Sequence, residues 1–121
     1  MPLTLTEVFV AIAAQNFSNL VQFYHNLLDL APTQTIPNRY AEFHLPGLKL
    51  GIFHPKQVLS RDLPAQQMSL CLEVADLDAA IAHLTQLGYP PPGEIILASH
   101  GREIYAYDPD GNWLILHQGI A

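Results

Sequence analysis

Several side chains of this 121-residue chain could do chemistry if the fold brought them together. His117 falls on a predicted strand, and its imidazole could bind a divalent metal together with the carboxylate of Glu7, Glu73 or Glu103. Nitrogen and oxygen donors of this kind suit nickel, manganese, iron or zinc. Each carboxylate could instead act as a general base if it were buried. The remaining histidines are interpreted as surface residues of helices, strand ends and turns: His25, His44, His54, His83 and His100.

A second candidate for chemistry is the thiol of Cys71, which lies one strand step from Ser69 on the same predicted face. Its thiolate would be a nucleophile if neighbouring groups lowered its pKa, but nothing in the sequence indicates such groups. A lone cysteine is more often a small buried apolar residue. Cys71 also has no partner for a disulfide within the chain, which fits a reducing compartment.

The strands that must position these residues have one aliphatic face, because strand side chains alternate between two faces. The aliphatic face should pack on the helices, and it comprises Val8, Val10, Ile12, Leu70, Leu72, Val74, Leu114 and Leu116. The opposite face should stay uncovered by the helices, and it comprises Glu7, Phe9, Ala11, Lys49, Gly51, Phe53, Ser69, Cys71, Glu73, Trp113, Ile115 and His117. A β-bulge would invert any one of these assignments.

The second half of the chain repeats the pattern of the first. An offset of 60 residues pairs Val10 with Leu70, and it continues through a helix with an apolar stripe at i, i+3, i+4 and i+7 in both copies. Beyond the helix the offset grows to 64 and pairs Leu50 with Leu114. Each copy therefore predicts a strand, a helix and three further strands.

Local signals predict where several of these elements begin and end. Asn16 and Asp76 stand where the N-caps of the two helices belong, and Gly88 stands where the second helix should stop. Residues Asp108–Asn112 predict a tight turn before the last strand, because Pro109 presets φ and Gly111 tolerates a positive φ.

The repeat and its motifs resemble the βαβββ module of the vicinal oxygen chelate superfamily, which includes glyoxalase I, extradiol dioxygenases, fosfomycin-resistance enzymes and bleomycin-resistance proteins. The most specific parts are Phe23–Leu30, Val74–Ala80 and Asp108–Asn112, and the resemblance covers nearly the whole chain. It implies an α+β fold in which two tandem modules form a curled mixed sheet around a concave cleft. We expect one domain over residues 1–121, with modules at 5–54 and 68–118 and a linker at 55–67.

The resemblance also implies a metal site, from which this sequence departs. Enzymes of the superfamily place His, Gln or Glu at the start of each module's first strand and a carboxylate or similar ligand in each last strand. The matching positions here are Phe9, Gly51, Ser69 and Ile115. Because a single hydroxyl does not hold a metal against water, we expect neither a metal nor another cofactor at these positions, and the usual glyoxalase or dioxygenase activity is not expected.

Similarity to fosfomycin-resistance proteins adds Tyr105 and Glu103 to the cleft. Their expected equivalents in the first module are Ala41 and Arg39, with Phe43 beside them. The predicted ligand-binding residues, many of them aromatic, are Phe9, Phe43, Phe53, Ser69, Cys71, Tyr105, Trp113, Ile115 and His117.

Composition excludes some classes of partner. Half of the residues are apolar and 13% are charged, which is typical of a globular domain. A net charge of −6 with five Lys and Arg argues against nucleic acid and anionic membranes as partners. No targeting or membrane-spanning segment is recognised, so a cytoplasmic location is expected.

Three functions are consistent with these observations. The favoured one is a metal-free small-molecule-binding protein, similar to the bleomycin-resistance branch, whose ligand is planar or amphipathic and whose clefts form with a second subunit in a homodimer. The first alternative is a lyase, isomerase or dioxygenase with a displaced metal near His117. The second is a non-catalytic interaction module whose aromatic residues fill the cleft. No catalytic residue is assigned.

Overall fold

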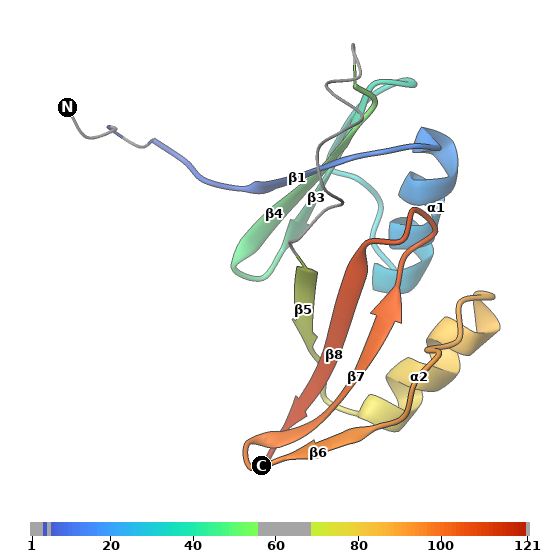
Figure 1. Cartoon of the computed structure of the whole chain (residues 1–121). Helices are drawn as coiled ribbons and strands as arrows, with labels where there is room; N and C mark the ends of the chain where they lie inside the picture. Colours follow the sequence, from blue (N-terminus) through green and yellow to red (C-terminus); the bar gives the residue numbers. More distant parts are fainter. Residues whose placement is uncertain (1–3, 5, 56–68, 121) are drawn as a thin grey trace, which may run out of the picture. The chain divides into compact units, whose positions relative to one another are not determined.

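The described residues form two similar modules, one within residues 1–59 and the other within residues 60–121 (Figure 1). The computed structural model describes residues 4, 6–55 and 69–120. The predicted linker at 55–67 lies, apart from Pro55, outside the described residues. No helix among those residues is long and apolar enough to cross a membrane.

Each module is a helix packed on a four-stranded mixed sheet. Module one consists of β1 (Val10–Ala13), α1 (Phe17–Leu28), β2 (Gln34–Ile36), β3 (Tyr40–Leu45) and β4 (Leu48–Phe53), in the sheet order β1-β4-β3-β2. Module two consists of β5 (Ser69–Glu73), α2 (Leu77–Gln86), β6 (Ile96–Ala98), β7 (Gly101–Tyr107) and β8 (Trp113–Gly119), in the order β5-β8-β7-β6. The prediction of an α+β fold with two tandem βαβββ modules is confirmed.

The first and last strands of each module are parallel neighbours, and their register repeats the pattern found in the sequence. Val10 pairs with Leu50 in module one, and Leu70 pairs with Leu114 in module two. These are the residues that the offsets of 60 and 64 place in equivalent positions, so the duplication in the sequence is also a duplication of strand pairing.

The helices begin where the sequence predicts. The side chain of Asn16 accepts a hydrogen bond from the Asn19 amide, and that of Asp76 accepts one from the Ala79 amide, both at 3.1 Å. Each bond satisfies an amide that the first turn of a helix leaves free. Gly88, with φ of 94°, follows the C-cap of α2, as expected for a helix stop.

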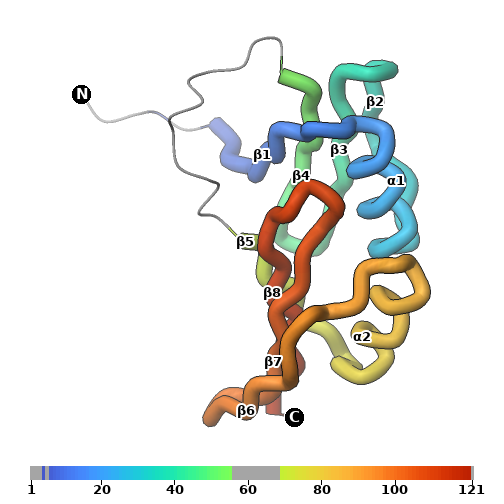
Figure 2. The backbone as a smooth tube through the Cα atoms, turned by 45° about the vertical axis from the view of Figure 1, so that its right-hand side comes forward, coloured from blue at the N-terminus to red at the C-terminus, as the bar shows by residue number. Residues whose placement is uncertain are grey.

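In each module the helix covers one sheet face and buries its aliphatic side chains (Figure 2). Leu50 and Ile52 of β4 and Leu114 and Leu116 of β8 are at most 2% exposed. Val8 is an exception to the predicted pattern, because it precedes the first residue of β1 and is 73% exposed. The alternation along β4 and β8 leaves their other side chains on the uncovered face.

The turn at Asp108–Asn112 has the predicted form. The buried carboxylate of Asp108 accepts hydrogen bonds from the amides of Asp110 and Asn112, both at 2.9 Å, and from Asn112 Nδ2 at 2.8 Å. Gly111 has a φ of 85°. This network fixes the register in which β8 returns alongside β7.

A close backbone approach requires glycine at residue 101, where β7 begins. Gly101 has a φ of 145°, and a Cβ added there would lie 2.2 Å from the carbonyl oxygen of Gln118 on β8. A side chain would therefore strain the backbone and also push β7 away from β8.

We predict that Gly101→Ala lowers the free energy of unfolding by about 3 kcal/mol or more, because backbone strain and a backbone clash act together. Urea unfolding followed by circular dichroism measures this change. Gly93→Ala is the matched control, since a Cβ at Gly93 meets nothing within 4 Å. Equal effects of the two substitutions would contradict the explanation.

Candidate functional site

We call the sheet face opposite α2 the open face of module two. Three strands supply it, and their register aligns the side chains in three cross-strand rows: Ser69, Trp113 and Tyr107; Cys71, Ile115 and Tyr105; and Glu73, His117 and Glu103. All nine are exposed or half-buried. The face therefore changes from an aromatic end to a charged end over the length of one strand.

The aromatic end of the open face presents ring surface to solvent. Trp113 is 44% exposed and Tyr105 is 37% exposed, with ring centroids 5.3 Å apart and planes tilted by 45°. Tyr107 meets the edge of Trp113 at a centroid distance of 5.5 Å. Tyr107 was not among the predicted ligand-binding residues, although its position two residues after Tyr105 on a strand indicates the same face.

The charged end of the open face is held by a chain of short contacts. His117 Nδ1 lies 2.6 Å from Glu73 Oε1, and the Gly119 amide donates to Glu73 Oε2 at 2.7 Å. On the other side of the His117 ring, Nε2 lies 2.8 Å from Nδ1 of His100. His100 is an exposed turn residue, as predicted, but its contact with His117 was not predicted. Gly101 beside it is the sequence signal of a tight hairpin that returns onto β8.

The electrostatics of this end favour an ionised Glu73 and a protonated Cys71. Hydrogen bonds from His117 and from the Gly119 amide hold the pKa of Glu73 below its ordinary value. Partial desolvation by neighbouring atoms raises the pKa of the Cys71 thiol, and the carboxylates of Glu73 and Glu103 raise it further. Cys71 is exposed, although a lone cysteine is more often buried. Because its thiol stays protonated at neutral pH, Cys71 is not an activated nucleophile.

Module one has a different side-chain network on its uncovered face. The Tyr40 hydroxyl donates to Glu42 Oε1 at 2.6 Å, and His44 Nε2 lies 2.7 Å from Glu42 Oε2. These bonds lower the pKa of Glu42, whereas burial and the bond to Glu42 raise the pKa of Tyr40 to about 12. The Tyr40 hydroxyl therefore keeps its proton at neutral pH and donates it in a hydrogen bond to an ionised carboxylate.

The prediction that Phe43 lines the uncovered face was wrong. Phe43 is fully buried and pairs with Leu50, and Ala41, also buried, pairs with Ile52. The reason is the hairpin length: four residues separate the paired His44 and Lys49 in module one, whereas five separate Tyr107 and Trp113 in module two.

Because the hairpin of module one is one residue shorter, every side chain of β3 lies on the face opposite to the one that the repeat with β7 predicts. The equivalents of Tyr105 and Glu103 are therefore Glu42 and Tyr40. Neither Ala41 nor Arg39 takes these positions, and Arg39 precedes the first residue of β3.

Unlike Phe43, the predicted residues Phe9, Phe53 and Lys49 of module one lie away from its helix-covered core. Phe53 is half-buried on β4, and Phe9, just before β1, is 42% exposed. Lys49 on β4 forms an ion pair with Glu7 at 2.5 Å. The ion pair engages the carboxylate of Glu7, which the sequence analysis named as a candidate metal ligand or general base.

The four positions at which the superfamily carries metal ligands do not fit a metal here. Phe9, Gly51 and Ile115 offer no donor atom, and Ser69 offers only an exposed hydroxyl. Gly51 is moreover covered, because a Cβ there would lie 2.9 Å from the Tyr40 hydroxyl. The Tyr40 ring occupies the space into which a ligand side chain at residue 51 would extend.

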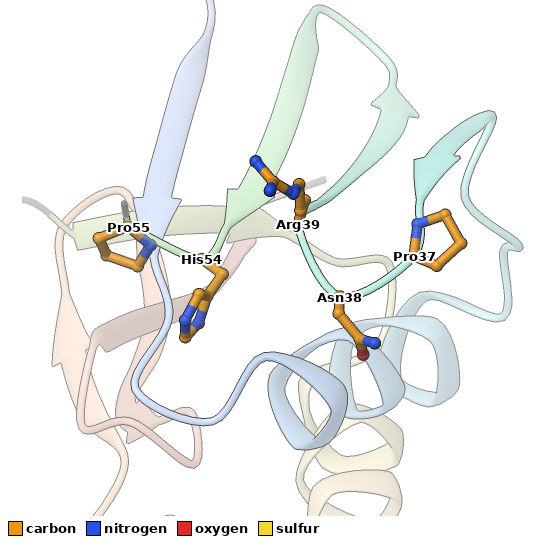
Figure 3. Close-up of a pocket in the computed structure, with 5 residues that line it drawn as sticks. All are labelled: Pro37, Asn38, Arg39, His54 and Pro55. Atoms are coloured by element: carbon orange, nitrogen blue, oxygen red, sulfur yellow. The ribbon is translucent and has the colours of Figure 1, made fainter. Parts of the chain in front are cut away.

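A hollow of about 550 Å³ lies in module one beside the start of β3 and the end of β4 (Figure 3). It is lined by Pro37, Asn38, Arg39, His54 and Pro55. In Figure 3 the side chains of Arg39 and His54 point in opposite directions. Because its polar groups do not converge on one point, this hollow is a weaker candidate for a binding site than the open face of module two.

Comparison with protein families identifies the class of protein. The profile of the Glyoxalase/Bleomycin resistance protein/Dioxygenase superfamily matches residues 8–116. The chain belongs to this superfamily, and the resemblance inferred from the sequence is confirmed. Comparison with curated protein sequences gave no match.

Solved structures share the fold at low sequence identity. The chain is similar to a lactoylglutathione lyase from Agrobacterium tumefaciens, with 18% identity, a TM-score of 0.73 and 94% of each chain covered. It is also similar to a glyoxalase/bleomycin resistance protein from Catenulispora acidiphila, with 24% identity, a TM-score of 0.70 and coverage of 93% of this chain and 97% of the other. A glyoxalase family protein from Enterococcus faecalis is similar as well, with 23% identity, a TM-score of 0.72 and coverage of 93% of this chain and 97% of the other.

The network around Glu42 predicts a specific pH dependence. Because the pKa of Glu42 is lowered from 4.5, its bonds contribute stability that is fully present above that pH and is lost as the pH falls through the lowered value. Tyr40→Phe removes one of these bonds, so we expect it to destabilise the protein more at pH 7 than at pH 3. Urea unfolding across this range measures the difference.

Tyr105→Phe in module two is the control for this experiment and should show no such trend. A destabilisation by Tyr40→Phe that is the same at both pH values would mean that the hydroxyl does not stabilise the ionised form of Glu42.

Proposed function

We propose that this protein binds a small amphipathic molecule on the open face of module two, without using the metal positions of its superfamily. The observation that carries the proposal is the pair of exposed aromatic rings, Trp113 and Tyr105, which stand at one end of a face whose other end is charged. Large adjacent aromatic rings in solvent are uncommon unless they serve contact with another molecule.

The aromatic end suits a flat apolar group. Trp113, Tyr105 and Tyr107 supply rigid surfaces that lose little conformational entropy when a ligand stacks on them. Ile115 continues the apolar surface along β8. A planar ring system laid on this surface would bury apolar area on both partners.

The charged end suits a cationic or hydrogen-bond-donating group. The carboxylates of Glu73 and Glu103 flank His117, and Glu73 is held in its ionised form. Trp113 and His117 are four residues apart on one strand, a separation of about 13 Å. A ligand of about this length, with a flat end and a positively charged end, would satisfy both parts of the face.

Binding without the superfamily's metal follows from the donor set. Phe9, Gly51, Ser69 and Ile115 offer a metal at most one hydroxyl, so the polar part of a ligand would have to be recognised by side chains directly. Cys71 offers no ready covalent chemistry, since its thiol is protonated at neutral pH. Reversible binding therefore suits this face better than the usual chemistry of the superfamily.

We further propose a homodimer in the cytoplasm. The superfamily resemblance supports the dimer, and the exposed thiol of Cys71 fits a reducing compartment. Size-exclusion chromatography with light scattering should give twice the chain mass of 13.4 kDa. A monomer at micromolar concentration would contradict this part of the proposal, and cell fractionation tests the location.

Fluorescence of Trp113 tests the binding proposal directly, because it is the single tryptophan of the chain. We expect 9-aminoacridine, a planar cation, to change the emission of Trp113 saturably, and to bind more tightly than the planar anion 9-anthracenecarboxylate. Tyr105→Ala should weaken binding about 10-fold, since it removes one stacking surface.

Leu97→Ala is the matched control. Leu97 is 79% exposed on β6 but pairs with Arg102, on the face opposite Tyr105, so its loss should leave the affinity unchanged. Equal effects of the two substitutions, or no saturable response to either compound, would contradict ligand binding at the open face and would favour a protein-interaction role for these rings.

A further inference from the structure

We propose that His100, Glu103 and His117 form a binding site for a divalent transition-metal ion such as Zn²⁺, at the charged end of the open face. Their donor atoms all lie within 4.8 Å of one another. This site goes beyond the proposed ligand binding, and it uses none of the four superfamily positions. His117 lies two residues beyond Ile115, a displacement of about 7 Å along β8.

The two imidazoles are already spaced as ligands of one ion. His100 Nδ1 and His117 Nε2 are 2.8 Å apart, and the ring planes are inclined by 33°. Two nitrogens bound to zinc at about 2.0–2.1 Å lie about 3.3 Å apart in a tetrahedral site. An increase of about half an ångström in the distance between the two nitrogens would therefore admit an ion between them, in place of the proton that they share.

Glu103 supplies the third donor. It lies directly opposite His117 in the β7–β8 ladder, where paired side chains emerge side by side on the same face. Two imidazoles and one carboxylate suit zinc, and also nickel, copper or iron, better than calcium or magnesium. Three protein ligands leave at least one coordination position for water or for another ligand.

Glu73 orients the site without binding the ion. Its Oε1 lies 2.6 Å from His117 Nδ1, so this nitrogen donates its proton to the carboxylate and Nε2 presents its lone pair. The Gly119 amide holds the other oxygen of Glu73. A carboxylate that fixes the tautomer of a ligand histidine is a recurrent part of metal sites and commonly contributes 10–100-fold to metal affinity.

The backbone places His100 over β8. His100 lies in the two-residue turn between β6 and β7, where Ala98 pairs with Gly101. Figure 1 shows this hairpin at the same end of the sheet as the last residues of β8. Because Gly101 lies against Gln118, the hairpin is fixed close to the strand that carries His117. All the ligands thus come from neighbouring strands and turns of one module.

The test uses the full chain without an affinity tag, titrated with Zn²⁺ in competition with a chromophoric chelator. We expect one Zn²⁺ per chain. His100→Ala and Glu103→Gln should each weaken binding at least 10-fold because each removes one donor, and Glu73→Gln should weaken it about 10–100-fold. His54→Ala removes an exposed histidine of module one and should have no effect.

Two further measurements keep the test decisive. Circular dichroism establishes that each variant is folded, and Co²⁺ in place of Zn²⁺ should give visible absorption bands that the His100→Ala variant loses. Absence of stoichiometric binding, or binding that His100→Ala and His54→Ala alter equally, would overturn the proposal and leave the cluster as a hydrogen-bonded histidine pair. The response of Trp113 to 9-aminoacridine is measured with EDTA present and so does not depend on a bound metal, and the two proposals can therefore fail separately.

Discussion

The packing of β8 on α2 is the constraint on which the functional face depends. Leu114 and Leu116 are buried, and the alternation of a strand then sends Trp113, Ile115 and His117 to the opposite side. A slip of one residue would bury the indole and the imidazole and expose the leucines. Burial of two leucines, secured by the hydrogen-bonded turn at Asp108–Asn112, therefore decides which groups lie on the open face.

The two modules share one fold but present different side chains on their uncovered faces. In module one a hairpin shorter by one residue turns Tyr40, Glu42 and His44 to the uncovered face, and Tyr40 covers Gly51. In module two the longer hairpin leaves Tyr105 and Glu103 on that face. At the superfamily's metal positions the one available donor is the Ser69 hydroxyl, whereas imidazoles and a carboxylate gather at the charged end of the open face.

The sequence predicts the elements and their pairing well, because these depend on local signals and on a repeat. Asn16, Asp76 and Gly111 act as the sequence indicates, and the repeat fixes the strand register. It predicts the site less completely. Phe43 was misplaced because one residue in a hairpin inverts a strand, and His100 was missed because its contact with His117 depends on a backbone approach that only Gly101 allows.

We propose that a metal binds at the charged end of the open face and not at the superfamily positions. A crystal of the Zn²⁺-loaded protein, with anomalous diffraction measured on both sides of the zinc absorption edge, tests this placement. We predict an anomalous peak coordinated by His100, Glu103 and His117, with Glu73 bonded to His117 behind it. A peak beside Ser69 or Ile115, or no bound metal in the cluster, would contradict it.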